Sequence, residues 1–213
     1  MTIDQSLKIA QMGFYITMAV VAILTYLKAK KTLLNSINTE YHKHVINALI
    51  GLSNELYSEF DKNSKTYWLN NTRIDEVVNE INKEFTKNKI AILASKKFGG
   101  GIRVLDLEDR LMTQIGRYKS DPFLPQVIRQ ETLDLLENRL IVFNTSYCDV
   151  ISNYMQDLAK GKHIETLESN SGWLHNKLNR ELYEQGCGIS QIEDAVHDIR
   201  LNIKTYLDKF NPF

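Results

Sequence analysis

The longest apolar run of the chain lies near its N-terminus, where no charged residue occurs from Ile9 to Leu27. As a helix, these 19 residues would be about 28 Å long, close to the thickness of the hydrocarbon core of a bilayer. Lysines bound the run at positions 8, 28, 30 and 31. The pattern predicts a transmembrane helix over residues 9–27.

Two alternatives remain open for this run. Gln11, Thr17 and Thr25 make it only moderately apolar, as in a buried core helix, but such a helix usually carries a charged face and this run has none. In a cleaved signal peptide, a small-residue cleavage site would follow, whereas here the run is followed by the sequence KAKK. We therefore favour a membrane span.

The lysines also predict the orientation of the span. Three follow it and one precedes it, which places the C-terminal side in the cytoplasm and makes residues 1–8 a short extracytoplasmic tail. Cys148 and Cys187 are expected to be reduced thiols, in agreement with a cytoplasmic body. The glycosylation sequons at Asn70 and Asn144 would then be accidental.

A second pattern lies within the span. Residues spaced four and three apart form a polar and small stripe along one helix face: Gln11, Tyr15, Met18, Ala22 and Thr25. Such a stripe could pack against another helix or line a watery path, and with one span either use requires further copies or a partner. The alternative is that its polar side chains bond their own backbone and have no further role.

The helical pattern continues beyond the bilayer. Apolar residues recur at steps of three and four from Leu33 to Phe60, which predicts one long helix, or two nearly collinear ones, from about Ser6 to about Asp61. We assign residues 28–61 to a juxtamembrane and oligomerisation helix, because its apolar stripe could pack on neighbouring copies.

Residues 62–213 are expected to form a cytoplasmic α-helical sensor domain, because period-two alternation is nearly absent. The fold class is therefore all-α, with a membrane anchor. Helix starts are predicted at Thr72, at Asp106, at Asp121-Pro122 and at the capping-box pair Ser190 and Glu193, with a turn at Ser169 to Gly172 before a helix that Gly186 closes. A strand at Ile90 to Leu93, paired with Ile102 to Leu105, remains an alternative to a continuous helix.

Composition narrows the function classes. Lys and Arg number 26 and Asp and Glu number 26, so the net charge is zero, which argues against bulk coating of nucleic acid. Two Cys in 213 residues exclude a disulfide scaffold, and 43% hydrophobic residues exclude a disordered chain.

One region departs from this balance. Lys83 to Arg103 holds six basic residues and one acid, and three glycines inside it could turn backbone N–H groups toward an anion. The predicted anion or nucleotide site consists of Lys96, Lys97, Gly99, Gly100, Gly101 and Arg103. The sequence matches neither a Walker A loop nor a dinucleotide fingerprint, and a solvated surface loop remains an alternative.

Features of an enzyme are scarce. The five His residues occur in no metal-binding spacing, so neither a metal nor another cofactor is expected. Cys187 lies between two glycines and could be nucleophilic with His175 or His197 as its partner, but we interpret it as a cysteine in a turn. We therefore expect that the protein is not an enzyme.

The plan of a single span, a basic and helical continuation and a basic glycine loop resembles small membrane effectors of bacterial anti-phage defence, such as the Hailong-type effector. The resemblance implies a homo-oligomeric ion channel or membrane-disrupting assembly in the bacterial inner membrane, gated by a nucleotide or oligonucleotide signal. The alternative is an adaptor or scaffold that holds a cytoplasmic partner at the inner membrane.

Overall fold

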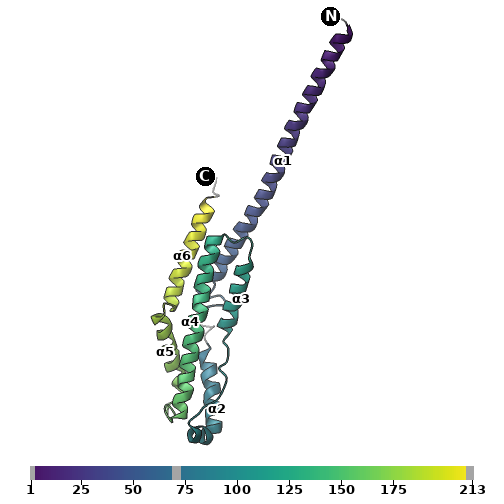
Figure 1. Ribbon diagram of the computed structural model, residues 1–213. Helices are drawn as coiled ribbons and strands as arrows, with labels where there is room; N and C mark the ends of the chain where they lie inside the picture. Colours follow the sequence, from purple (N-terminus) through teal and green to yellow (C-terminus); the bar gives the residue numbers. More distant parts are fainter. Residues whose placement is uncertain (1–2, 69–72, 210–213) are drawn as a thin grey trace. The chain divides into compact units, whose positions relative to one another are not determined.

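The chain is all-helical in the residues that the structure describes. The computed structural model describes residues 3–68 and 73–209, and within them it contains helices, turns and loops but no strand (Figure 1). The helices are α1 (Ile3–Tyr57), α2 (Ile74–Ser95), α3 (Asp106–Ser120), α4 (Gln126–Ala159), α5 (Asn170–Glu184) and α6 (Ile189–Asp208). The all-α prediction is confirmed. Asn70 and the predicted helix cap Thr72 lie outside the described residues.

The chain divides into two compact units, Met1–Asn47 and Ala48–Phe213. α1 is a single helix of 55 residues, so the alternative of two collinear helices is not observed. Its last ten residues, 48–57, belong to the second unit.

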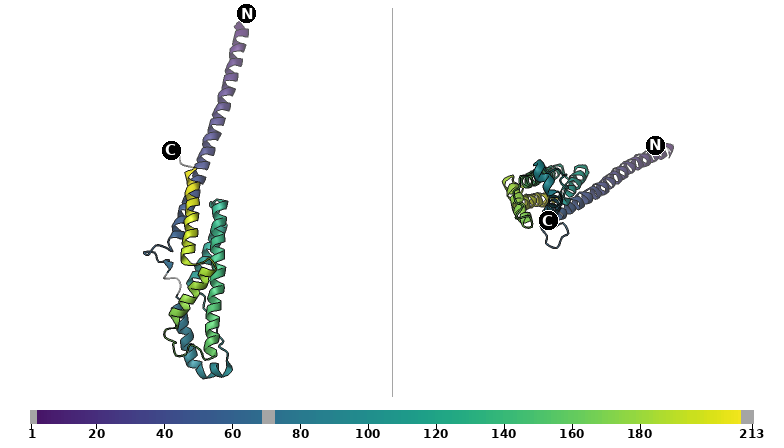
Figure 2. Two further views of the ribbon diagram at one scale, coloured as in Figure 1. Left: turned by 90° about the vertical axis from the view of Figure 1, so that its left-hand side faces the viewer. Right: turned by 90° about the horizontal axis from the view of Figure 1, so that it is seen from below.

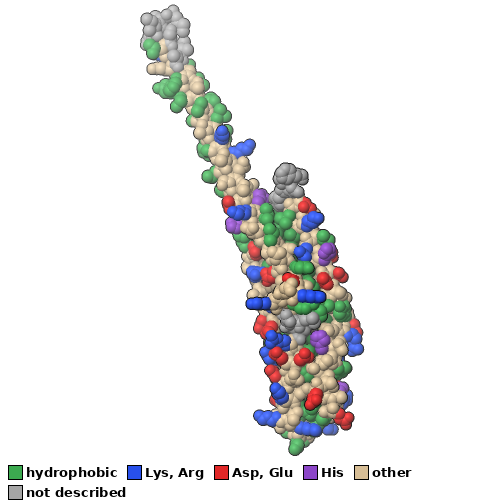
Figure 3. Space-filling model, turned by 180° about the vertical axis from the view of Figure 1, so that it is seen from behind, with side chains coloured by type: hydrophobic (Ala, Val, Ile, Leu, Met, Phe, Trp, Pro, Cys, Tyr) green, Lys and Arg blue, Asp and Glu red, His purple; other side chains and the backbone are tan. Residues whose placement is uncertain are grey.

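Among the described residues, one helix is long and apolar enough to cross a membrane, by length and composition: it is the part of α1 from Gln11 onward, and none of its apolar window is buried. Hydrophobic side chains are spread along the described part of this stretch of α1 on the face shown in Figure 3. Phe14 and Leu24 are each 61% exposed, and Tyr26 is 66% exposed. A core helix of a soluble domain would bury these side chains, so the exposure favours the predicted anchor over the core-helix alternative.

The second unit is a bundle around α4. This helix of 34 residues contacts α2, α3, α5 and α6, and Figure 2 shows the bundle from the side and end-on. The core of the unit consists of fully buried aliphatic and aromatic side chains, among them Leu49, Leu52, Phe85, Leu111, Phe143, Tyr147, Ile151, Tyr154 and Leu174. Burial of these side chains drives the packing of the bundle.

α2 contains the segment for which a strand was the alternative. Ile90 to Leu93 are helical, and residues 102–105 have no regular structure, so the strand pair is not observed. The helix bends at Asn88, whose backbone leaves the helical region (φ −113°, ψ 18°). Apolar β-compatible residues therefore remain helical here.

The start of α4 differs from the prediction. The helix begins at Gln126, and Asp121 instead forms a turn in which its Oδ1 accepts a 2.8 Å hydrogen bond from the Phe123 N–H. Arg129 closes this turn, because its Nη2 donates to the carbonyl oxygens of Asp121 and Leu124. Asp before Pro stabilises a turn as well as a helix start, and here the turn is the outcome.

The last two helices also begin at other residues than predicted. α5 begins at Asn170, inside the predicted turn, because the buried Asn170 amide donates to the His163 carbonyl and to Tyr154 Oη. The N–H of Gly188 donates to Gln191 Oε1 at 2.8 Å and fixes the start of α6, so the cap predicted at Ser190 is wrong by two residues. Gly186 follows α5 with a φ of +76°, as expected for a glycine that ends a helix.

Candidate ligand site

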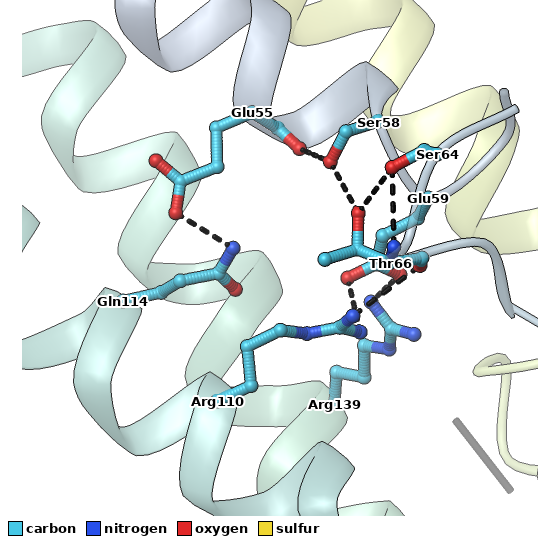
Figure 4. A network of polar contacts seen from close by, with 8 residues as sticks. All are labelled: Glu55, Ser58, Glu59, Ser64, Thr66, Arg110, Gln114 and Arg139. Atoms are coloured by element: carbon cyan, nitrogen blue, oxygen red, sulfur yellow. Dashed lines mark hydrogen bonds and ion pairs between the residues drawn. The ribbon is translucent and has the colours of Figure 1, made fainter. Parts of the chain in front are cut away.

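A buried carboxylate between two arginines lies at the centre of the second unit. Glu59 follows α1 and is 4% exposed. Its Oε1 accepts a 2.7 Å hydrogen bond from Arg110 Nη2 of α3, and its Oε2 lies 2.7 Å from Arg139 Nη1 of α4 (Figure 4). The three side chains therefore join the end of α1 to α3 and α4 with one negative and two positive charges.

A second carboxylate on α1 extends this cluster. Glu55 accepts hydrogen bonds from Gln114 Nε2 at 3.1 Å and from Tyr118 Oη at 2.6 Å, and it forms an ion pair with Arg117. These partners lie on α3. Two carboxylates from α1 and its following turn thus meet three arginines, which leaves the cluster with one excess positive charge.

Hydroxyl groups hold the loop after α1 against the cluster. The Thr66 hydroxyl bonds both Ser58 and Ser64 at 2.8 Å, and the Thr66 carbonyl accepts a 3.3 Å hydrogen bond from Arg110 Nη1 (Figure 4). Burial lowers the pKa of Arg110, Glu59 opposes this shift, and Arg139 adds to it. The guanidinium groups therefore repel one another across Glu59.

A cavity of about 260 Å³ opens beside Arg139. Its walls are mainly apolar and come from the loop after α1 and from α3, α4, α5 and α6: Trp68, Leu107, Phe143, Leu182, Ile189 and Ile192. Its polar lining includes Arg139, Asn179, Tyr183 and Cys187. Among the described residues that line it, Arg139 is the one charged side chain.

Cys187 lies in the turn between α5 and α6 and is 6% exposed. Burial raises the pKa of its thiol, and Arg139 opposes this shift. Asn138 Nδ2 lies 3.5 Å from its Sγ. A buried thiol with a raised pKa is a weak nucleophile at neutral pH, which agrees with the interpretation of Cys187 as a cysteine in a turn.

The predicted anion site lies in another part of the second unit, after α2. Lys96 caps this helix in the left-handed conformation (φ 52°), and Lys96 and Lys97 are exposed. The Lys97 N–H is already bonded to Ser95 Oγ at 3.3 Å. None of Gly99, Gly100 and Gly101 has a positive φ, so they do not use the conformation that distinguishes glycine.

Arg103 is drawn toward the first half of α2. Its Nη1 donates to Glu80 Oε1 at 3.1 Å and lies 3.8 Å from Glu76 Oε2. Its carbonyl oxygen accepts a 2.9 Å hydrogen bond from Tyr147 Oη of α4. The structure therefore keeps Lys96, Lys97 and the glycines together in one exposed loop, while carboxylates compensate Arg103.

The stripe in the span is exposed. Gln11, Tyr15, Met18, Ala22 and Thr25 all lie on the surface of α1. Thr25 Oγ1 donates to the Val21 carbonyl at 2.8 Å, and Thr17 likewise bonds the Gly13 carbonyl at 2.9 Å. The threonine hydroxyls are thus satisfied by the backbone of their own helix, which a hydroxyl in hydrocarbon requires.

Within the part of the chain that the structure describes, no three His, Cys, Asp or Glu side chains are placed to hold a metal ion. Over the described residues, the chain is thus all-helical, with one candidate membrane-spanning helix and a bundle that contains a small, mainly apolar cavity. Comparisons of the chain with protein-family models, with curated proteins and with solved structures found no match.

Neither the Glu59 cluster nor the cavity is among the sites predicted from the sequence. Glu59 lies 51 residues from Arg110, and nothing in the local pattern marks it as buried.

Proposed function

We propose that the protein is a ligand-controlled, homo-oligomeric membrane effector, which forms an ion channel or a membrane-disrupting assembly. The supporting observation is that α1 contains both the exposed, charge-free run and, in its last turns, Glu55 of the polar cluster. A change in the bundle could act on the span through this one helix, without an intervening linker.

In this proposal the span crosses the bacterial inner membrane once, with the N-terminus outside and the second unit in the cytoplasm. The lysines that follow the span support this orientation. In the defence setting that the resemblance implies, the gating ligand is a nucleotide or oligonucleotide, and the exposed lysines and glycines after α2 are its proposed contacts.

The test is membrane depolarisation in bacteria that express the full chain, with a potential-sensitive dye as the readout. Gln11→Leu and Thr25→Leu are expected to abolish depolarisation, because a channel needs the polar stripe at its axis. Ile23→Leu, on the opposite side of the helix, is the matched control and is expected to depolarise as the wild type does. Equal depolarisation by all variants, or a monomer in detergent, would contradict the channel.

The ligand contacts are tested separately. The double variant Lys96→Glu, Lys97→Glu is expected to lose binding of phosphorylated ligands such as ATP and short oligoadenylates. The control is Lys62→Glu, Lys65→Glu, which makes the same change of charge at exposed lysines in the loop after α1. Unchanged binding by the first variant would remove this loop from the proposal.

An adaptor that holds a cytoplasmic partner at the membrane is the second candidate. The observation that favours it is the bond from Thr25 to its own helix backbone, since this hydroxyl then needs no polar partner in a pore. An adaptor would tolerate both stripe variants and would not depolarise the membrane, so the same experiment separates the two functions.

A further inference from the structure

The cavity beside Arg139 combines an apolar wall with a cation that is incompletely compensated. The Arg139 side chain is 11% exposed, and its Nη1 lies 2.7 Å from Glu59 Oε2. The Glu59 carboxylate is shared, because Arg110 donates to its other oxygen at 2.7 Å. One carboxylate therefore serves two guanidinium groups.

Apart from the Nη1 contact with Glu59, the donors of Arg139 have no partner among the described residues. In the described residues, no hydrogen bond has an Arg139 N–H as its donor, although a guanidinium carries five such groups. Its contact with Glu59 has the distance of an ion pair without the geometry of a hydrogen bond. Arg139 can thus present donors to a second anion from its position in the cavity wall.

The rest of the cavity lining indicates which uncharged part such an anion would carry. Phe143, Leu182 and Ile192 offer apolar surface, and Asn179 adds an uncharged polar group. The volume of about 260 Å³ lies just below the range of roughly 300–1,000 Å³ that is usual for small-molecule sites. A compact ligand fits this space, whereas an oligonucleotide does not.

We propose that this cavity binds a small amphipathic anion, with its carboxylate on the Arg139 guanidinium and its ring or short acyl body against Phe143, Leu182 and Ile192. The bound carboxylate supplies the second negative charge that the Glu59, Arg110 and Arg139 group lacks. This site is separate from the exposed loop after α2, and the proposal does not depend on the channel function.

The test uses two probes of nearly the same shape, para-trifluoromethylbenzoate and para-trifluoromethylbenzamide, which differ in charge. Binding to the full chain in phosphatidylcholine nanodiscs is measured by fluorine NMR, with empty nanodiscs as the blank for partition into lipid. The benzoate is expected to bind at least about tenfold more tightly than the amide, because a charge-assisted bond to arginine is available to it alone.

Two variants form a matched pair, because each removes one of the two cations that share Glu59. Arg139→Gln removes the cation in the cavity wall and is expected to weaken benzoate binding about tenfold or more, with little effect on the amide. Arg110→Gln leaves Glu59 to Arg139 alone, so it is expected to weaken benzoate binding by less than Arg139→Gln does, because the Arg139 contact remains. It should leave the amide within about threefold of the wild type.

A third variant tests the location without changing the charge. Leu182→Trp fills the cavity and is expected to weaken both probes. Equal binding of benzoate and amide, equal effects of the two arginine variants, or no binding of the benzoate up to about 5 mM would each overturn the proposal. Circular dichroism of every variant shows whether the helices are retained, so that loss of fold is not counted as loss of binding.

Discussion

Gly188 lies so close to the ring of Tyr183 that a Cβ at this glycine would come within 2.4 Å of Tyr183 Cδ1. The ring also accepts hydrogen bonds at its Oη from the Ser190 hydroxyl at 3.3 Å and from the Ser190 N–H at 3.5 Å. The turn from α5 to α6 therefore depends on the absence of a side chain at Gly188, and this turn forms one wall of the cavity.

Gly188→Ala is expected to destabilise the protein by about 1–3 kcal/mol, because the Tyr183 ring must move or the turn must open. Urea unfolding of the full chain in nanodiscs, followed by tryptophan fluorescence, measures the change. Gly172→Ala is the control, since a Cβ there meets no atom within 4 Å. In a Tyr183→Ala background, Gly188→Ala should cost less, and an unchanged cost would contradict the contact.

Glu59→Gln is expected to lower the free energy of unfolding by about 3–5 kcal/mol, because Arg110 and Arg139, whose side chains are only 19% and 11% exposed, would lose their shared counter-charge. The same unfolding experiment measures it. The control Glu80→Gln breaks an ion pair with Arg103 in which both side chains are at least half exposed, and it should cost about 0–1 kcal/mol. Similar costs for the two variants would show that Glu59 is not held as described.

The midpoint of the pH dependence of Cys187 alkylation is expected to lie above pH 9.0, the ordinary pKa of the thiol, because burial raises the pKa of this group. Arg139→Gln should move the midpoint to still higher pH, since Arg139 opposes the effect of burial. A Cys148→Ser background isolates the reaction, which mass spectrometry follows. A midpoint at or below pH 9.0 in the wild type would contradict the buried thiol.

The same shift predicts a dependence of stability on pH. As the pH rises, the Cys187 thiol of the unfolded chain ionises at a lower pH than the thiol of the folded chain. Between these two pKa values the folded state therefore binds more protons. The contribution of Cys187 to the free energy of unfolding should therefore decrease as the pH rises above about 9. Cys187→Ser should reduce this alkaline loss of stability.

Val20→Arg is expected to weaken retention in the membrane, because a charge near the centre of a span costs about 2.5–3.5 kcal/mol on insertion scales. Extraction of membranes with alkaline carbonate measures retention. Ser36→Arg, placed beyond the lysines that follow the span, is the control and should stay in the membrane fraction. Full retention of Val20→Arg would favour a helix that does not cross the bilayer.

Most of the helical fold could be predicted because its signals are local. The three- and four-residue spacing of apolar side chains indicated the long first helix, and the acids at Asp106 and Asp109 marked the start of α3. The predicted start of α4 was wrong because Asp121 and Pro122 fit a turn as well as a helix cap. The hydrogen bonds from Arg129 to the carbonyl oxygens of Asp121 and Leu124 favour the turn.

The buried cluster could not be predicted for a different reason. The burial of Glu59 depends on arginines from two other helices, and a local pattern does not show which distant charges meet. The basic loop stood out in the sequence because its basic residues lie within a few positions of one another, yet its Arg103 is compensated by Glu80 of α2. The sequence shows where basic residues cluster, but which acid each of them pairs with depends on the fold.

Because two arginines, Arg110 and Arg139, share the one carboxylate of Glu59, the order in which these three positions can be substituted in related proteins is constrained. Loss of either arginine leaves a balanced pair, whereas loss of Glu59 first leaves two neighbouring cations in the interior. Along a lineage, substitution at position 110 or 139 should therefore come before substitution at position 59. Relatives without the acid should also lack at least one of the bases, which is a form of epistasis that an alignment of homologues would reveal.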